Sequence, residues 1–230
     1  MSPTQPAAGS RHPVSGLTAD HPGVVELFAL LAYGEVAAFY RLTDEARMAP
    51  NLYGRINMAS MAAAEMGHYE LLREALERRG VDVVPAMSRY ASALENYHRL
   101  TTPSTWLEAL VKTYVGDALA ADFYLEIADV LPGEIADVVR GVLAETGHSE
   151  FVIAEVRAAV AASDMQRSRL ALWSRRLLGE AITQAQYVLA DRDELVDLML
   201  SSTGGLGQMA EFFDRLQRTH AERMSHLGLA

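Results

Sequence analysis

The sequence has no cysteine, a single lysine and no long uninterrupted apolar run. The absence of cysteine excludes disulfide bonds, cysteine-ligated zinc and iron–sulfur clusters, and it fits a reducing compartment, so we expect a cytoplasmic protein. Because no run of 18 apolar residues is present, we expect no membrane span. Residues 1–20 are rich in Pro, Ala, Gly and Ser and lack the apolar core of a signal peptide, which predicts a disordered tail.

Arginine carries almost all of the positive charge, because Lys112 is the only lysine among 20 basic residues, and the formal net charge is −10. Such an acidic balance disfavours extended contact with nucleic acid, since neutralisation of phosphates drives that binding. The basic cluster of one late segment consists of Arg167, Arg169, Arg175 and Arg176. We interpret it either as a solvated helix face or as a contact for the phosphates of a nucleic acid or for an acidic partner.

Half of the residues are hydrophobic, and their periodicity is that of helices. Ser104 or Thr105 is expected to cap the third helix, with Glu108 closing a capping box. The pattern predicts an all-α protein with a four-helix bundle over residues 21–162 and a C-terminal helical extension over 163–230. That extension either covers the bundle or forms a homodimer face. Helices are expected at 22–48, 51–79, 104–130, 134–162, 165–189, 191–200 and 208–227, with a long connection at 81–102.

A short set of polar residues occurs twice along the chain. The first copy is Glu35, followed 30 residues later by Glu65-Met66-Gly67-His68. The second is Asp117, followed 28 residues later by Glu145-Thr146-Gly147-His148. The spacings and the A-E-x-G-H flanks match, whereas a lone E-x-x-H is expected by chance. Two helical hairpins that bear the same ligands are how a dinuclear metal centre is built inside a four-helix bundle.

Each of these polar residues lies on an apolar helical stripe, which is an unfavourable place for a free charge. Burying an isolated carboxylate costs on the order of tens of kcal/mol by Born estimates unless it is protonated or paired. No lysine or arginine occupies the stripes, so two divalent cations are the expected partners of the four carboxylates. Carboxylate-rich ligand sets with imidazole suit iron or manganese.

The chain contains a third E-x-x-H, Glu95-Asn96-Tyr97-His98, between Pro85 and Pro103. It lacks the A-E-x-G-H flank and falls in the expected connection, so we interpret it as a surface feature. His220 and His226 have no matching carboxylates and are also expected at the surface. Tyr114 lies one turn before Asp117 on the same face and is either a hydrogen-bond donor to the ligands or an ordinary core tyrosine.

The doubled motif resembles the ferritin-like di-iron carboxylate superfamily over roughly residues 21–162. By that resemblance Glu65 and Glu145 would bridge two irons, His68 and His148 would each bind one, and Glu35 and Asp117 would be terminal ligands. Asp117 stands where Glu is commoner. Asp122 is its rival, but it lies about 140° further around the helix.

Within the superfamily, the nearest likeness is to bacterial tRNA hydroxylases of isopentenyl-type hypermodified adenosine and to actinobacterial ferritin-like proteins named after them. The A-E-x-G-H form, the bundle length and the extra C-terminal helices carry this likeness. It implies an oxygenase or hydroxylase that uses two iron or manganese ions, O2 and an external electron donor, with tRNA as a candidate substrate. The alternatives are a small-molecule oxidase unrelated to tRNA, iron storage or peroxide scavenging, and a bundle that keeps metal only for structure.

Overall fold

The computed structural model describes residues 18–128, 131–143, 149–203 and 206–230, and these residues form helices and no strand. The prediction of an all-α fold is therefore confirmed. The helices are α1 Pro22–Glu45, α2 Leu52–Glu77, α3 Val83–Ser88, α4 Ala91–Leu100, α5 Trp106–Ala128, α6 Gly133–Val142, α7 Ser149–Ala162, α8 Asp164–Ala190, α9 Asp193–Thr203 and α10 Leu206–Leu227, and the 3-10 turn η1 covers Ala46–Met48.

Local signals define the α1–α2 hairpin, which holds the first copy of the motif. Pro22 occupies the first turn of α1, where its missing N–H costs nothing. The Asn51 side chain caps α2 by accepting a hydrogen bond from the Gly54 N–H at 2.8 Å. After α2, Gly80 adopts a φ of 69°, a left-handed conformation that glycine takes without strain and that ends helices.

The N-terminus of α5 has the expected capping interactions. The Glu108 N–H donates to Thr105 Oγ1 at 3.2 Å, and Glu108 Oε2 accepts from the Ser104 N–H at 2.7 Å. Two backbone donors that have no partner within the helix are thereby satisfied.

Thr105→Ala should therefore destabilise the protein by about 1 kcal/mol, because the Glu108 N–H loses its acceptor. The free energy of unfolding from urea denaturation would measure this. Thr105→Ser, which keeps the hydroxyl, serves as the control and should lose much less. Equal losses in the two variants would show that Thr105 acts through packing instead of capping.

The long connection expected at 81–102 has helices of its own, which were not predicted from the sequence. This segment contains α3 and α4, and α4 packs against α8 and α1. The cause is the amphipathic pattern of α4, whose apolar side includes Leu94 and Tyr97. The expected single helix at 134–162 is observed as α6 and α7, on either side of residues 144–148, which lie outside the described residues.

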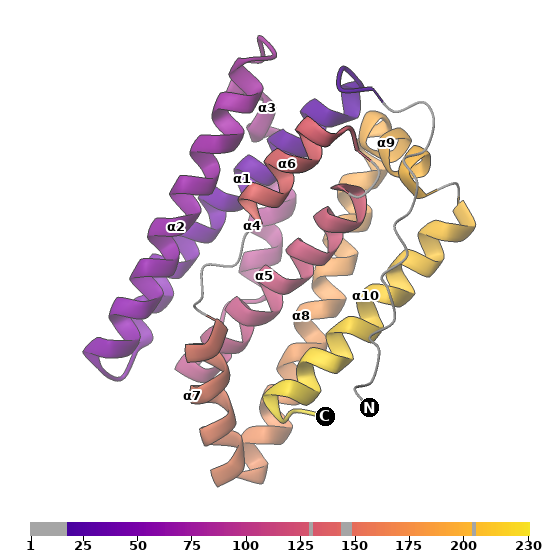
Figure 1. The fold of residues 1–230 in the computed structure, drawn as a ribbon. Coiled ribbons are helices and arrows are strands. Elements are labelled where there is room, and N and C mark those ends of the chain that lie inside the picture. Colours follow the sequence, from indigo (N-terminus) through magenta and orange to yellow (C-terminus); the bar gives the residue numbers. More distant parts are fainter. Residues whose placement is uncertain (1–17, 129–130, 144–148, 204–205) are drawn as a thin grey trace, which may run out of the picture.

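The C-terminal helices pack on the earlier ones (Figure 1). Helix α8 lies along α5 and α4, α9 contacts α1, and α10 contacts α5 and α9. In Figure 1 the α1–α2 hairpin and α10 are on opposite sides, with α5 and α8 between them. Helix α5, which carries the start of the second motif copy, is therefore covered by the C-terminal helices.

Two hydrophobic cores flank the middle of the α1–α2 hairpin. One includes the first half of α1, up to Ala32, and the second half of α2, from Leu72. The other begins at Leu42 on α1 and includes Met58 to Ala62 on α2. The stretch between the cores, about residues 33–41 of α1 and 63–71 of α2, holds the polar residues of the first motif copy. Packing on both sides thus positions a polar region inside the molecule.

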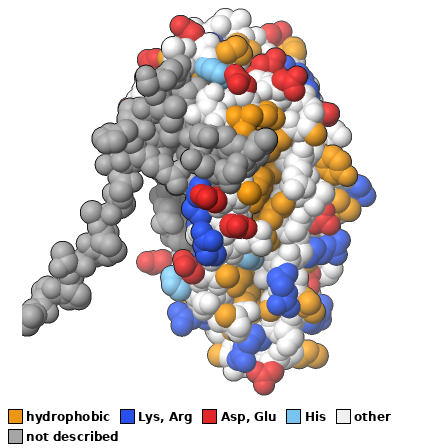
Figure 2. Space-filling model, turned by 90° about the vertical axis from the view of Figure 1, so that its right-hand side faces the viewer, with side chains coloured by type: hydrophobic (Ala, Val, Ile, Leu, Met, Phe, Trp, Pro, Cys, Tyr) orange, Lys and Arg blue, Asp and Glu red, His pale blue; other side chains and the backbone are white. Residues whose placement is uncertain are grey.

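One described helix, Pro22–Met48, is long and apolar enough to cross a membrane by length and composition. Half of its most apolar stretch is buried within the fold, as is also usual for a central helix of a soluble protein. On the face shown in Figure 2, acidic, basic and hydrophobic side chains are intermixed.

Candidate metal centre

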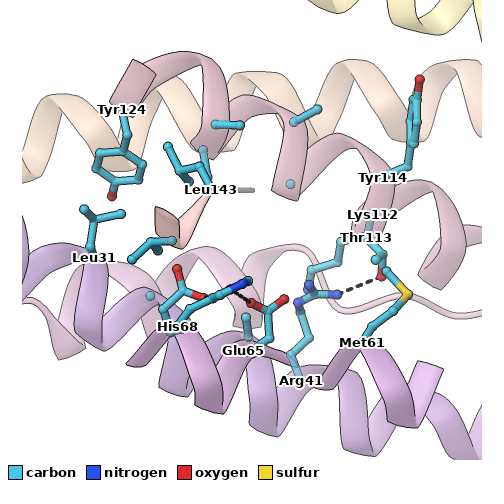
Figure 3. A pocket seen from close by; sticks show the side chains of 18 of the residues that line it. Leu31, Arg41, Met61, Glu65, His68, Lys112, Thr113, Tyr114, Tyr124 and Leu143 are labelled. Atoms are coloured by element: carbon cyan, nitrogen blue, oxygen red, sulfur yellow. Dashed lines mark hydrogen bonds and ion pairs between the residues drawn. The ribbon is translucent and has the colours of Figure 1, made fainter. Parts of the chain in front are cut away.

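Helices α1 and α2 bring together three side chains that the sequence singled out. Glu35 comes from α1, and Glu65 and His68 come from successive turns of α2. Nδ1 of His68 lies 3.4 Å from Glu35 Oε2 and 3.3 Å from Glu65 Oε2. One ligand atom of each residue lies within 4.8 Å of the others. Figure 3 shows Glu65 and His68 side by side at the cavity. The arrangement is close enough for one metal ion to contact all three.

The three groups shift each other's pKa values strongly. Burial raises the pKa of Glu35 to about 8, and the neighbouring Glu65 adds to this effect against the opposing hydrogen bond from His68. Burial also acts to raise the pKa of Glu65, but hydrogen bonds from His68 and Glu35 outweigh it and lower that pKa. Hydrogen bonds to both carboxylates raise the pKa of His68 to about 10. Protons held by Glu35 and His68 therefore compensate part of the negative charge of the cluster. A bound cation would neutralise the same charge.

The cluster borders a cavity of about 350 Å³, which we call the site cavity. Its opposite wall comes from α5, including Gly116 and Ala118 on either side of Asp117. Val142 and Leu143, just before residues 144–148, also line it. The described neighbours of the second motif copy therefore face the same space as the first copy.

Only half of the expected ligand set can be placed. Asp117 belongs to α5, but its side chain lies outside the described part of the structure. Glu145 and His148 lie outside the described residues. Their assignment as ligands remains a prediction from the sequence. The donor set of Glu35, Glu65 and His68 fits iron or manganese, since both ions favour carboxylate and imidazole ligands with open positions.

Comparison with known proteins identifies the family. Residues 19–202 match the family described as "Ferritin-like domain, actinomycetes". The chain belongs to this family. A search of curated proteins finds no significant match. The predicted ferritin-like fold is thereby confirmed, and the family match extends beyond the expected bundle at 21–162 into α8 and α9.

In this ferritin-like domain Asp122, the alternative to Asp117 as a metal ligand, has another partner. Its carboxylate forms a two-point ion pair with the guanidinium of Arg223 from α10, with Asp122 Oδ1 accepting from Nη2 at 2.6 Å. Asp122 thus links α5 to the C-terminal helix. A carboxylate engaged in this way is poorly placed to bind metal as well.

We therefore expect Asp117→Asn to lower the iron content of the purified protein and Asp122→Asn to leave it unchanged. Asp122→Asn should instead cost about 1–3 kcal/mol of stability, because Arg223 loses its charged partner. Iron per chain and urea unfolding would be measured for both variants. Loss of iron in Asp122→Asn alone would reverse the assignment.

Two buried cations lie near the site, although neither occupies a ligand stripe. Arg41 pairs with Glu45 at 2.9 Å and donates to Thr113 at 3.0 Å. Its charge also contributes to lowering the pKa of Glu65. Lys112 lies 3.7 Å from Glu45 and donates to the Thr101 carbonyl at 2.8 Å. Arg41 and Lys112 line the site cavity. The periodicity of a single helix did not identify them, because they lie on turns next to those that carry the ligand stripes.

The interpretation of the third E-x-x-H as a surface feature is wrong for His98. Glu95 is exposed and accepts a hydrogen bond from the Tyr33 hydroxyl at 2.6 Å. His98, in contrast, lines the site cavity, and its buried Nδ1 has no hydrogen-bond partner in the structure. Burial, with the charges of Arg41 and Lys112, lowers the pKa of His98 to about 2, so the imidazole is neutral. The E-x-x-H spacing drew attention to His98, but its position at the site cavity follows only from the packing of α4.

His220 also differs from expectation. It is buried with 4% of its surface exposed, and burial lowers its pKa, whereas His226 is exposed as expected. The periodicity of α10 explains this, because Phe212, Leu216, His220 and Met224 share one buried side.

Two tyrosines occupy opposite ends of the site cavity (Figure 3). Tyr114, interpreted from the sequence as either a hydrogen-bond donor to the ligands or a core tyrosine, lies at the end with Met61 and Thr113. Tyr124 lies at the other end, near Leu31. Burial and the charge of Glu35 raise the pKa of Tyr124, so its hydroxyl remains protonated. The charge of Glu35 therefore acts on the Tyr124 hydroxyl.

Three of the four clustered arginines have partners within the chain. Arg167 pairs with Asp164 at 2.9 Å, Arg169 lies 3.6 Å from Glu108, and Arg176 donates to the Leu100 carbonyl at 2.6 Å. These contacts connect α8 with its own first turn, with α5 and with the end of α4. They favour the interpretation of a solvated helix face over that of a phosphate contact.

Proposed function

We propose that this ferritin-like protein is a di-metal carboxylate oxygenase of the cytoplasm that uses iron or manganese. The observation that carries the proposal is the convergence of Glu35, Glu65 and His68 on a cavity large enough for a substrate. Glu65, His68 and Glu35 would hold one side of the centre, and Asp117, Glu145 and His148 would complete it. When bound, such a pair of ions supplies activation of O2, with electrons from an external donor.

The surrounding residues support chemistry in this cavity. Arg41 and Lys112 place positive charge near the carboxylates, and their partner Glu45 fixes them. The protonated Tyr124 hydroxyl can donate a hydrogen bond beside Glu35. The neutral His98 can accept or donate one to a bound molecule without adding charge. Each of these residues would help to position a substrate that enters the site cavity.

Hydroxylation of a tRNA nucleoside is the finer proposal suggested by the likeness to tRNA hydroxylases. The internal contacts of Arg167, Arg169 and Arg176 weaken it, because phosphates would have to compete with these partners. We therefore favour a small molecule as the substrate. Binding of total tRNA at low salt, with an affinity that falls steeply as the salt concentration rises, would instead support tRNA as the substrate.

The decisive experiment measures metal content and O2 consumption on the same sample. Protein expressed with supplemental iron should contain about two iron or manganese ions per chain, as expected for this ligand set. The chemically reduced protein should then consume O2, and size-exclusion mass should correspond to a monomer or dimer. A hollow oligomeric shell that takes up many more irons would establish storage instead. Metal-free protein after supplementation would overturn the proposal.

A further inference from the structure

A second cavity, which we call the apolar cavity, lies between α4, α5, α8 and the neighbouring helices. Its volume is about 180 Å³, and no charged residue is among the described residues that line it. Small side chains on α8, Ala181 and Ala185, leave this space open where larger ones would fill it. In another protein, an apolar cavity of about 150 Å³ stays dry and binds benzene. The apolar cavity is thus suited to a hydrocarbon group.

The two cavities are adjacent. They share the lining residues Leu94 and Tyr97 of α4 and Gly116, Ala120 and Tyr124 of α5. Tyr124 also lies near enough to Glu35 for that carboxylate to add to the effect of burial in raising the pKa of its hydroxyl. These shared residues form the boundary that a molecule at the ligand cluster would cross to extend into the apolar cavity.

We propose that the apolar cavity binds the hydrocarbon chain of a small-molecule substrate whose other end lies beside Glu35, Glu65 and His68. This rests on the proposed function for the site cavity and adds the substrate class to it. Burial of the chain against leucine, valine and alanine side chains supplies affinity, and the lack of charged groups excludes an ionic tail. The polar part of the molecule remains in the site cavity, where Arg41, His98 and Lys112 are found.

The junction offers two positions at which a substitution would reduce the space between the cavities. Ala120 faces both cavities, so Ala120→Leu would place a side chain in the passage. A Cβ built at Gly116 meets no atom within 4 Å, so Gly116→Ala is a smaller obstruction at the same place. Matched controls are Ala158→Leu on α7 and Gly179→Ala on α8, because both residues are exposed and line neither cavity.

Binding of straight-chain primary alcohols from butanol to decanol, measured by calorimetry on the full chain, tests the proposal. Affinity should rise about fourfold for each added methylene until the apolar cavity is full. Ala120→Leu should weaken the longest bound alcohols at least about tenfold and change butanol little, with a smaller loss in Gly116→Ala. Both controls should match wild type. An affinity independent of chain length, or unchanged in Ala120→Leu with helical content retained, would overturn the proposal.

A second measurement separates this proposal from that of the metal centre. In protein loaded with Mn²⁺, the paramagnetic ion should broaden the proton resonances next to the alcohol oxygen more than those of the terminal methyl group. Chain-length dependence without any broadening would contradict the metal centre and leave the apolar cavity supported. Stronger broadening of the terminal methyl group would overturn the proposed orientation of the chain.

Discussion

Replacing Glu65 by alanine should leave the purified protein without bound iron or manganese. A ligand atom of Glu65 lies within 4.8 Å of those of His68 and Glu35, and Glu65 is the expected bridge between two ions. Its removal would take a carboxylate from both expected ions and would leave His68 with one carboxylate contact. Elemental analysis after expression with supplemental iron would measure the loss.

Glu70→Ala is the matched control, because Glu70 lies on the same helix, is exposed and pairs with Arg73 outside the cluster. It should keep the wild-type metal content. Retention of two ions per chain in Glu65→Ala would contradict the assignment of Glu65, even if the variant were less stable. Loss of metal in both variants would point to a general failure of the fold and contradict a local role.

The first half of the site was predictable because it depends on one hairpin. Glu65 and His68 lie one turn apart on α2, and a short connection returns the chain so that Glu35 faces them. Helical periodicity and the loop length are both properties of the local sequence. The capping interactions of Thr105 and Glu108 were predictable for the same reason.

The rest of the cavity wall depends on which helices meet in space. His98 reaches the site cavity because α4 packs against α1 and α8, and the amphipathic pattern of α4 does not specify which helices it contacts. The apolar cavity likewise arises where small residues of α5 and α8 face each other. The position of His98 and this cavity are results of tertiary packing, so periodicity along one helix could not reveal them.

Removing the carboxylate of Glu45 should destabilise the protein by about 3–5 kcal/mol, because two buried cations then lose their counter-charge. Glu45 is 5% exposed and lies between Arg41 and Lys112, whose side chains are also buried. Glu45→Ala should therefore unfold at a much lower urea concentration than wild type. Glu74→Ala is the control, since its pair with Arg78 has the same helical spacing but is exposed, and its loss should be less than about 1 kcal/mol.

The pH dependence identifies the contribution of Lys112. Burial, together with Arg41, lowers the pKa of Lys112 to about 8, and Glu45 opposes this shift. Without Glu45 the folded protein releases the Lys112 proton at a lower pH, whereas the unfolded chain still binds it up to about pH 10.4. Stability rises with pH wherever the unfolded state binds more protons. Part of the loss in Glu45→Ala should therefore be recovered between neutral pH and pH 8, while the part due to Arg41 persists. A difference in unfolding free energy that stays constant over this range would show that Lys112 does not depend on Glu45.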